Sequence, residues 1–541
     1  MTVYPTLIEI VEKTRSYHNK VALKVPRLDH KGYEEASFNE LLGWSQTLAA
    51  SLQHHGIQPE DRVALIAKPR LEWAIAFYGV LLAGAVVVPI DASLKPPEVE
   101  RLLQATQTQW VMLSSAWLSD LRQLDGLAQR VPSLKHWVSF DHDALDDVLT
   151  FGELLKGEAR LTSVERKPAD LALLMCTSGT TGDAKAVMLS HENLSSNVVN
   201  ALQIIDIETN DTVVEIAPWN HIFAVLVLLI CTHKGATMVY TDDYRNLASV
   251  LSKNEATILV GVPKLFHGMF EKLEHAIKAS WTKRLTYRFL PGVVGEKVRA
   301  RFGGRLRFFV SGSAPLDPNV MQGFRRLGIG MVEGYGMTET APALTASTPF
   351  NDKFGSVGSP LPTIELKIAD PDKERVGEVV VRGPNVMRGY YKNEARTREA
   401  IDEDGWLHTG DLGYLDEDNW LFLKGRKKNV IVLENGKNVY PEEVEFALSK
   451  IPEIAEIMVC AGKRKGVEVI KVLVYPEGNA LNNASPQALK STLWASVRQE
   501  SQKLAPFKRP KSEHDLVLVD APFEKTSTLD VKRYLYQSEA D

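Results

Sequence analysis

Residues 177–185 read Thr-Ser-Gly-Thr-Thr-Gly-Asp-Ala-Lys, and this stretch is the starting point for interpreting the whole chain. It lies between the apolar runs 171–175 and 187–189. Its two glycines let the backbone approach an anion, and its four hydroxyls, its N–H groups and Lys185 can donate to phosphate oxygens. The spacing is neither GxxxxGK[ST] nor GxGxxG, which excludes two common nucleotide loops. Composition alone leaves a hydroxyl-rich surface loop as an equal alternative.

Short apolar runs alternate with helical patterns on both sides of this stretch. Residues 62–67 and 85–90 are typical of buried strands, with a helix predicted over 71–82 between them and another opening at Pro96. Similar apolar runs recur at 110–113, 257–262 and 306–310. This alternation predicts an α/β fold in which mostly parallel sheets are flanked by helices.

The pattern changes in the last third of the chain. Segments 364–368 and 377–382 are short and alternating, which predicts a small antiparallel or β-barrel-like unit. A glycine inside the basic stretch 424–428 marks a second break, and an α+β pattern follows it. We therefore expect a large N-terminal domain, residues 1–427, and a small C-terminal α+β domain, residues 428–541.

Composition is that of an ordinary globular protein. Of 541 residues, 44% are hydrophobic and 24% are charged. The formal charge of 63 − 68 = −5 argues against a nucleic-acid partner. Three cysteines without CxxC spacing, and no HExxH, favour neither a disulfide framework nor a common zinc site. We recognise no signal peptide, and the apolar run 222–231 is shorter than the ~20 residues that span a bilayer. We expect a cytoplasmic protein without a transmembrane segment.

The segment TSGTTGDAKAVMLSHENL, residues 177–194, resembles the phosphate loop of AMP-forming acyl-CoA synthetases and other adenylating enzymes, the ANL superfamily. Ala184 and Ala186 stand where that family usually has proline and glycine. Further motifs follow in the family's order, so the resemblance covers nearly the whole chain. It implies that ATP phosphates are bound by Thr177, Ser178, Gly179, Thr180, Thr181, Gly182 and Lys185.

The stretch Glu333–Thr340, EGYGMTET, matches a second family signature. The match implies that Tyr335, beside Gly336, stacks on adenine. It also implies that Thr338 donates to the α-phosphate and that Glu339 ligates Mg²⁺. Without its neighbours the stretch would be an ordinary exposed turn.

Two further segments resemble the part of the family site that holds the acyl group. Residues 217–223 are similar to the segment whose histidine or aromatic residue lies beside the acyl carbonyl, which implies a catalytic role for His221. A lone histidine is otherwise more often a packed core residue. The following run is uncharged, and a buried ammonium group would be costly without a partner, so an apolar acyl tail is expected. The stretch 303–316, GGRLRFFVSGSAPL, looks most like the fatty acyl-CoA synthetase branch and implies cofactor contacts from Gly312, Ser313 and Ala314.

Two residues resemble the family groups that hold the ribose. Asp411, in the segment 406–412, is similar to a carboxylate that accepts hydrogen bonds from both ribose hydroxyls. Arg426, in the basic stretch 425–429, would reach the same sugar. A basic run is usually a solvated loop, so this second match depends on its neighbours.

The same basic stretch resembles the family hinge. This implies that Lys428 lies at the pivot of a mobile small domain. Residues 435–445 resemble the loop that lines the pantetheine tunnel, where Gly436 would leave room for the thiol arm of coenzyme A.

One segment departs from the family pattern. Relatives usually end with a segment like PKTSTGKIKR, whose lysine bridges the carboxylate and the α-phosphate, but residues 524–533 read EKTSTLDVKR and put Asp530 at the lysine position. Losing one preorganised donor costs about 10²–10³ in rate, and a negative charge should cost more. Three explanations stay open: Lys525 or Lys532 substitutes, adenylation is weak while thioester formation survives, or the protein binds its ligands with little turnover.

The motifs together indicate an AMP-forming fatty acid–CoA ligase that uses ATP, Mg²⁺ and coenzyme A on a medium- or long-chain fatty acid. One alternative is an acyl-adenylate enzyme that delivers to an acyl carrier protein. The other is a catalytically impaired nucleotide- and acyl-binding homologue. Asp530 is included among the catalytic positions because its charge decides between these possibilities. Peripheral contact with a membrane and the oligomeric state are left open.

Overall fold

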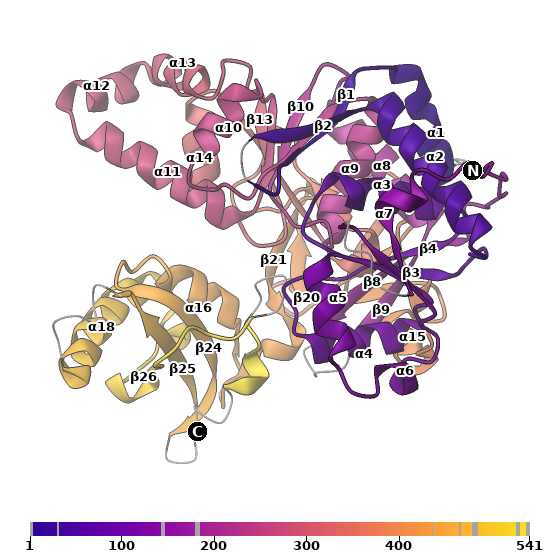
Figure 1. The fold of residues 1–541 in the computed structure, drawn as a ribbon. Helices are drawn as coiled ribbons and strands as arrows, with labels where there is room; N and C mark the ends of the chain where they lie inside the picture. The colour runs from indigo at the N-terminus through magenta and orange to yellow at the C-terminus, as the bar shows by residue number, and fades with distance from the viewer. Residues whose placement is uncertain are drawn as a thin grey trace.

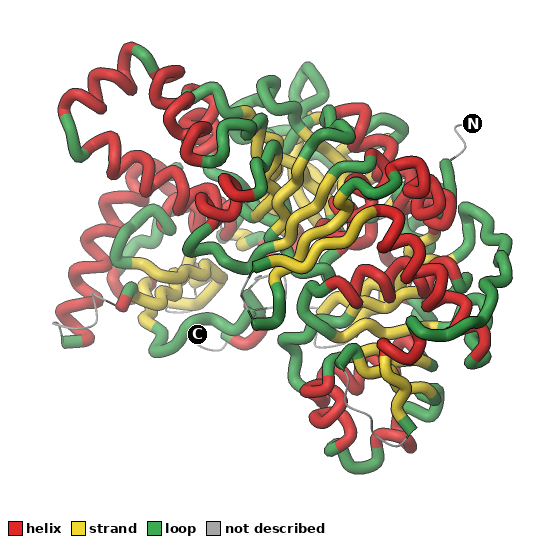
Figure 2. The backbone as a smooth tube through the Cα atoms, turned by 45° about the horizontal axis from the view of Figure 1, so that its top comes forward, coloured by secondary structure: helices red, strands yellow, loops and turns green. Residues whose placement is uncertain are grey.

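The protein is described by a computed structural model that covers residues 4–29, 32–141, 147–178, 184–434, 436–464, 467–478, 485–525 and 531–536. Two large, mostly parallel sheets form the body, and a smaller domain lies beside it (Figure 1). Figure 2 shows the strands in the interior with helices packed outside them. The predicted α/β class is confirmed by this architecture.

The first large sheet has mixed pairing at one end only. Six neighbouring strands run parallel, and the hairpin that carries the phosphate-loop segment is added antiparallel at one end. Its order is β19 (Gly389–Tyr390), β9 (Ala184–Ser190), β8 (Leu171–Ser178), β4 (Val86–Pro89), β3 (Arg62–Ile66), β5 (Trp110–Leu113), β6 (His136–Ser139) and β7 (Val148–Thr150).

The second large sheet is parallel in its centre and antiparallel at both edges. Its order is β16 (Ser359–Pro360), β15 (Ala343–Ala346), β14 (Gly330–Gly336), β13 (Phe308–Ser311), β12 (Ile258–Gly261), β10 (Thr212–Glu215), β11 (Thr237–Tyr240), β1 (Val21–Pro26) and β2 (Tyr33–Ser37). The parallel strands bring their carboxyl ends to one edge, where ligands bind in open α/β sheets.

Helices connect and cover the two sheets. The predicted helix over 71–82 is α3 (Leu71–Leu82), and it is buried from Trp73 onward because nearly all its side chains are apolar. Capping boxes fix other starts, as at Ser37 before α2 and Ser190 before α8. The helices of the body are α1 (Leu7–Lys13), α2 (Phe38–His54), α4 (Pro96–Thr106), α5 (Ser115–Arg122), α6 (Leu127–Arg130), α7 (Phe151–Leu154), α8 (His191–Ile204), α9 (Ile222–Lys234), α10 (Leu247–Lys253), α11 (Pro263–Lys278), α12 (Trp281–Phe289), α13 (Pro291–Arg301), α14 (Pro318–Arg326) and α15 (Glu394–Ala400).

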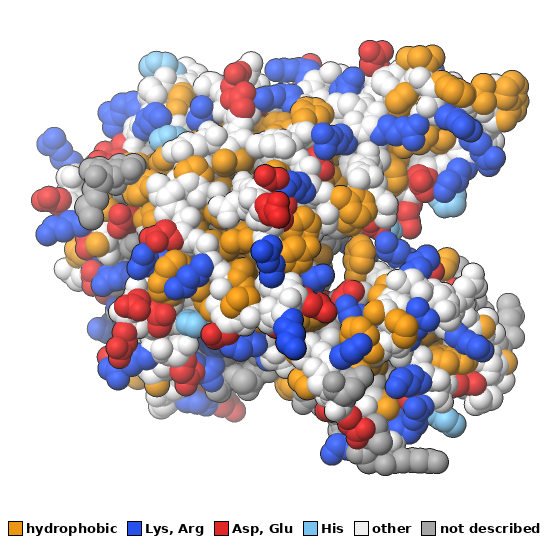
Figure 3. Space-filling view, turned by 180° about the vertical axis from the view of Figure 1, so that it is seen from behind, with side chains coloured by type: hydrophobic (Ala, Val, Ile, Leu, Met, Phe, Trp, Pro, Cys, Tyr) orange, Lys and Arg blue, Asp and Glu red, His pale blue; other side chains and the backbone are white. Residues whose placement is uncertain are grey.

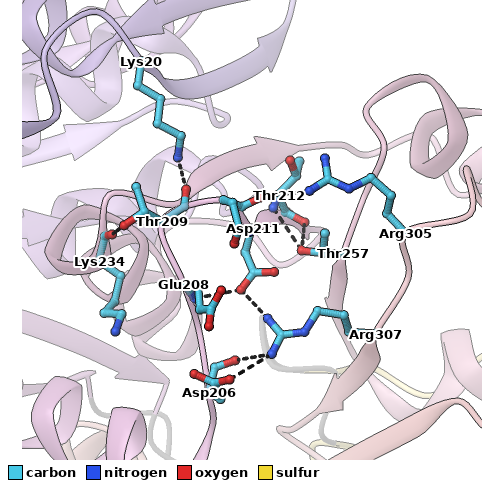
Figure 4. A network of polar contacts seen from close by, with 11 residues as sticks. Lys20, Asp206, Glu208, Thr209, Asp211, Thr212, Lys234, Thr257, Arg305 and Arg307 are labelled. Carbon is cyan, nitrogen blue, oxygen red and sulfur yellow. Dashed lines mark hydrogen bonds and ion pairs between the residues drawn. The ribbon is translucent and has the colours of Figure 1, made fainter.

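A polar network ties together the amino ends of the second sheet (Figure 4). Arg307, just before β13, donates to buried Asp211, just before β10, at 2.6 Å and reaches Asp206 at 3.2 Å. The backbone N–H of Thr212 donates to the hydroxyl of Thr257 at 3.0 Å. Because these strands are parallel, the network lies at the end of the sheet opposite to their carboxyl ends, so it fixes the sheet without occupying the ligand edge.

The last third of the chain forms two smaller units. The predicted antiparallel unit is a four-stranded sheet of β17 (Glu365–Ala369), β18 (Gly377–Arg382), β20 (Leu407–Leu415) and β21 (Leu421–Arg426). The C-terminal unit has its own apolar core. It is built from β22 (Ile431–Val432), β23 (Asn438–Val439), α16 (Pro441–Leu448), β24 (Ile454–Arg464), β25 (Val467–Pro476), α18 (Pro486–Glu500) and β26 (Leu516–Leu518). Among the described residues, none of the helices has the length and apolar character needed to cross a membrane.

Candidate active site

A cavity of about 1730 Å³ lies between the body, the four-stranded sheet and the C-terminal unit. Its polar part is lined from the carboxyl ends of β13 and β14 and from β20 and β21. Its apolar part extends along α9 and the end of α8. Most of the residues predicted from the motifs meet here, although they are spread over more than 240 positions of sequence. The cavity is lined by His221, Gly312, Ser313, Ala314, Tyr335, Gly336, Thr338, Glu339, Asp411, Arg426, Lys428 and Lys185.

Three of these residues form a connected polar group. The hydroxyl of Tyr335 donates to Asp411 Oδ2 at 2.7 Å, and Arg426 Nε lies 2.9 Å from Asp411 Oδ1. Asp411 and Arg426 are opposite each other in the β20–β21 ladder, so the sheet register holds the ion pair together. Burial raises the pKa of Asp411, while Arg426 and the Tyr335 hydroxyl pull it down. The carboxylate therefore stays oriented between a cation and a hydroxyl donor.

The turn after β14 places a carboxylate close to this group. Thr338 and Glu339 lie in a 3₁₀ turn, and Glu339 is buried with Oε1 accepting the hydroxyl of Tyr390 at 2.8 Å. Gly336 is required here because a Cβ would lie 1.9 Å from the carbonyl oxygen of Pro342. Only glycine lets the backbone pass so close to the following strand.

The phosphate-loop segment is only partly within the described residues. β8 and β9 form an antiparallel hairpin in which Thr177 pairs with Lys185 and Ser178 with Ala184. Lys185 Nζ lies 5.1 Å from the ring centre of Tyr390. The predicted loop residues Gly179, Thr180, Thr181 and Gly182 lie outside the described residues, as does Asp530.

The acyl part of the cavity begins at the start of α9. His221 precedes the helix, and the ring of Phe223 packs against Gly312, where a Cβ would meet it at 3.1 Å. The helix then presents a series of apolar side chains to the cavity: Leu226, Val227, Ile230 and Cys231. Since α9 rises about 1.5 Å per residue, these side chains lie progressively farther from His221. The apolar run that was too short to span a bilayer thus lines an internal pocket.

The C-terminal unit contacts the body close to the predicted hinge. Lys428 lies in a short turn after β21. Within the C-terminal unit, the neighbouring Asn429 donates to Glu442 of α16 at 2.6 Å. Lys450 Nζ, after α16, lies 3.2 Å from Asp317 Oδ2. The other carboxylate oxygen of Asp317, Oδ1, accepts the N–H of Asn319, which makes Asp317 the N-cap of α14. In the described part of the chain, the Lys450–Asp317 pair joins the two parts, and the apolar core of the C-terminal unit is separate from that of the body.

Gly436 occupies a different position. It lies in an exposed turn before β23 with φ of +74°, a conformation that favours glycine. It is not among the described residues that line the cavity. Its predicted contact with the pantetheine arm stays a prediction.

The terminal segment is attached to its own domain through Arg533. Its guanidinium donates to Glu445 of α16 at 2.6 Å and to the carbonyl of Val459 at 2.8 Å. Lys532 lines the cavity, whereas Lys525 pairs with Glu456 of β24. The two lysines that could substitute for the usual one are therefore in different surroundings.

Sequence reasoning missed two residues that organise this site. Tyr390 hydrogen-bonds Glu339 and underlies Lys185, and Glu442 receives the amide of the residue next to Lys428. Tyr390 belongs to a two-residue strand, too short to give a periodic signal. Its only sequence sign is the aromatic pair after Gly389.

Comparisons with known proteins agree with this geometry. A family model described as AMP-binding enzyme matches residues 10–391, and one for the AMP-binding enzyme C-terminal domain matches residues 428–539. The chain is 33% identical over 457 residues to the long-chain-fatty-acid–CoA ligase FadD15 of Mycobacterium bovis, covering 78% of this chain and 74% of that protein. It is 28% identical to a long-chain-fatty-acid–CoA ligase of Bacillus subtilis, covering 88% and 86%.

Solved structures share the fold over the full length. The anthranilate CoA ligase AuaEII in complex with anthranoyl-AMP superposes with a TM-score of 0.80 at 21% identity, covering 100% of this chain and 98% of that one. A Mycobacterium tuberculosis fatty acyl CoA synthetase gives 0.69 at 22% identity, covering 99% and 98%. Since the first family model spans well over half of the chain, the protein belongs to the AMP-binding enzymes of the ANL superfamily.

Proposed function

We propose that this enzyme activates a medium- or long-chain fatty acid with ATP and transfers the acyl group to coenzyme A, releasing AMP and pyrophosphate. The observation that carries the proposal is one cavity with a polar end at Tyr335, Asp411 and Arg426 and an apolar end along α9. A nucleoside fits the first end and an uncharged hydrocarbon the second. The fatty-acid ligase names of the curated relatives support the same substrate class.

The chemistry proceeds through a better leaving group. A free carboxylate acylates poorly because oxide would have to leave. In the first step a carboxylate oxygen bonds to the α-phosphorus of ATP, and the bond from that phosphorus to the pyrophosphate oxygen breaks. In the second step the thiolate of coenzyme A attacks the acyl carbonyl and AMP departs. Thr338 would donate to the α-phosphate, Lys185 would bind the released pyrophosphate, and His221 would orient the carbonyl.

Glu339 is the residue that would hold Mg²⁺. One of its oxygens is bonded to Tyr390, and the hydroxyl of Thr338 is adjacent in the chain, so the donor set is made of hard oxygens. Mg²⁺ binds through one or two carboxylates together with substrate phosphates rather than in a complete protein cage. When bound, the ion neutralises phosphate charge during the first step.

We further propose the division of the chain into domains 1–427 and 428–541, with Lys428 as the pivot. The separate core of the C-terminal unit supports this division. Rotation about a few residues at the end of β21 would exchange the terminal segment for the segment with Gly436, which would admit the pantetheine arm. The side chains that must move apart are then polar ones such as Lys450 and Asp317.

The experiment that tests the function is pyrophosphate release with a panel of fatty acids, followed by acyl transfer to coenzyme A or to a holo-acyl carrier protein. The proposal expects release that depends on a medium- or long-chain acid, and thioester formation with coenzyme A. Transfer to the carrier protein alone would favour the carrier-protein alternative. Absence of release with every acid would contradict the ligase.

A separate experiment tests whether Lys532 or Lys525 replaces the lysine that the family usually has at position 530, because Lys532 lines the cavity and Lys525 does not. If Lys532 supplies the missing cation, Lys532→Met lowers pyrophosphate release about tenfold or more, from the loss of one donor at the reacting anions. Lys525→Met serves as the matched control and leaves release unchanged. If the Asp530→Lys variant releases pyrophosphate much faster than the wild type, the impaired-enzyme alternative is supported. If the wild type releases pyrophosphate rapidly and the variant is slower, that alternative is contradicted.

A further inference from the structure

Three helices form an arm that projects from the body of the protein. The arm consists of α11, α12 and α13, which are inserted between β12 and β13 of the second sheet. Figure 1 shows α12 at the outer end of this projection, at the upper left. No residue between 263 and 301 is among the described residues that line the active-site cavity. The arm is therefore separate from the site described above.

The outer helix exposes an apolar stripe. Trp281, Leu285 and Phe289 recur every fourth residue and so lie on one face of α12, with exposed fractions of 74%, 53% and 67%. Leu290 and Val293 continue the surface into α13 and are also exposed. Of the thirteen large apolar side chains that are exposed in the described part of the chain, these five lie within 281–293. Contiguous exposed apolar surface of this kind marks an interaction site, whereas scattered residues do not.

Cations lie beside the stripe, with Arg284 and Arg288 on one flank of α12. Residues 278–301 contain seven lysines and arginines and one acid, Glu296, so the segment has a charge of 7 − 1 = +6 in a chain whose total is −5. The three bases of α12 are Lys283, Arg284 and Arg288, and all three are exposed. In the part of the chain that the structure describes, none of the three has an ion pair with an acidic side chain. Figure 3 shows hydrophobic and basic side chains together at the tip of the arm, at the upper right.

The apolar side chains of the stripe do not contribute to the packing of α12 against the rest of the protein. α12 has no buried residue, and the residue that packs toward the body is Tyr287, which lies under the guanidinium of Arg326 at 4.8 Å. Helical spacing puts Tyr287 on the face opposite to the stripe. Substitutions in the stripe therefore remove surface groups without opening the core.

We propose that this arm is a docking surface for an anionic lipid bilayer. An aromatic and aliphatic face bordered by lysine and arginine inserts into the boundary between headgroups and acyl chains, and the cations bind the lipid phosphates. The surplus of positive charge on an otherwise acidic protein selects an anionic surface over a neutral one. The surface is a convex tip rather than a groove, which suits a bilayer better than a peptide or helix ligand. Membrane binding is independent of the proposed ligase activity and can be measured without it.

The test is flotation of the full-length protein with vesicles of phosphatidylcholine alone or mixed with phosphatidylglycerol. We expect binding to the anionic vesicles that weakens with salt, and little binding to the neutral ones. The triple variant Lys283→Gln, Arg284→Gln and Arg288→Gln should lose about 10²-fold in affinity, since each cation near an anionic membrane contributes about fivefold. Trp281→Ser combined with Phe289→Ser should also abolish flotation.

The matched control is Phe350→Ser combined with Phe354→Ser, which removes two exposed aromatic residues outside the arm. This control should float like the wild type. All variants should keep the wild-type thermal unfolding temperature and the wild-type rate with a short, freely dissolved acid. Wild-type protein that does not float with anionic vesicles would overturn the proposal. Arm variants that float as well as the wild type would also overturn it. So would self-association of the wild type in sedimentation velocity that the arm substitutions abolish, because the stripe would then be a contact between two copies of the protein.

Discussion

The two ends of the active-site cavity are organised in opposite ways. At the polar end, Asp411 is bonded to both Tyr335 and Arg426. At the apolar end, α9 offers side chains such as Leu226 and Ile230 that have no directional partner in the cavity. Hydrogen bonds and ion pairs depend on geometry, while apolar burial depends on area. A single substitution at the polar end should therefore remove most of the activity. A substitution at the apolar end should lower the activity by an amount that depends on the length of the acyl chain.

The largest effect is expected for Asp411→Asn. The amide keeps the shape of the side chain but loses the charge that pairs with Arg426. Hydrogen bonds to charged groups contribute about 1.5–3 kcal/mol each, so kcat/KM for ATP should fall about 10²-fold. Asp418→Asn is the control, because Asp418 is an exposed aspartate just beyond the same strand, where it pairs with Lys353. An Asp411→Asn enzyme with wild-type kcat/KM would show that this carboxylate does not hold the nucleotide.

A graded effect is expected at the other end for Ile230→Trp. The larger ring would shorten the cavity at a point nine residues beyond His221 along α9. Excluding about two methylene groups, at about 0.8 kcal/mol each, should lower kcat/KM about tenfold for the longest accepted acids. Acids too short to reach Ile230 should keep their rates. Leu229→Met, a change on the same helix at a buried position outside the lining, should leave the chain-length profile unchanged.

The polar end can be examined further through pH. Burial raises the pKa of Asp411, and Arg426 opposes that increase. Because the proposed contact with the ribose requires the carboxylate, kcat/KM for ATP should fall with decreasing pH through a pKa above the usual value of about 4. Arg426→Met removes the opposing cation and should move this acid limb to still higher pH, in addition to lowering the plateau. Arg398→Met, at an exposed surface ion pair, should not move it. An acid limb that moves downward in Arg426→Met would contradict the assignment.

The smallest effect is expected between the domains. Lys450 and Asp317 form an ion pair that is partly open to solvent, and such pairs contribute about 0–1 kcal/mol. Lys450→Met should therefore change kcat less than about fivefold. The measurement is steady-state thioester formation, with Lys503→Met as a surface control. A larger loss would show that domain contact is set by this pair rather than shared among several polar groups.

The large elements could be predicted from the sequence because their patterns are local. The helix over 71–82 and the strand over 110–113 follow from continuous apolar runs bounded by polar residues, and both agree with α3 and β5. The α/β class followed from their alternation. Gly336 could be identified from a motif. The reason that glycine is required there could not, because a Cβ at position 336 would lie 1.9 Å from the carbonyl oxygen of Pro342, which directly precedes a later strand. Such distances are a property of the assembled sheet and have no signal in sequence.

The residues that line the cavity could be predicted only where a motif contained them. Tyr335, Asp411 and Arg426 were expected to contact one nucleotide, and the structure brings them into direct contact with each other. Tyr390 was missed because it acts through a side-chain hydroxyl on a two-residue strand. The arm was missed as a surface because exposure of Trp281 is a tertiary property, and an apolar residue in a helix is more often buried.

The N-cap role of Asp317 has a consequence for how quickly the enzyme can cycle. Its carboxylate accepts the N–H and the side-chain amide of Asn319 at 2.9 Å each, independently of Lys450. In the proposed rotation of the small domain, Asp317 would keep these bonds at the start of α14 and Lys450 would pass into water. Neither charge would then be buried without a partner, so this ion pair could form and break repeatedly at little cost in free energy. In that proposed motion, an ion pair of this kind would orient the two domains as they close and would add little to the barrier for reopening, which would favour repeated turnover over retention of product.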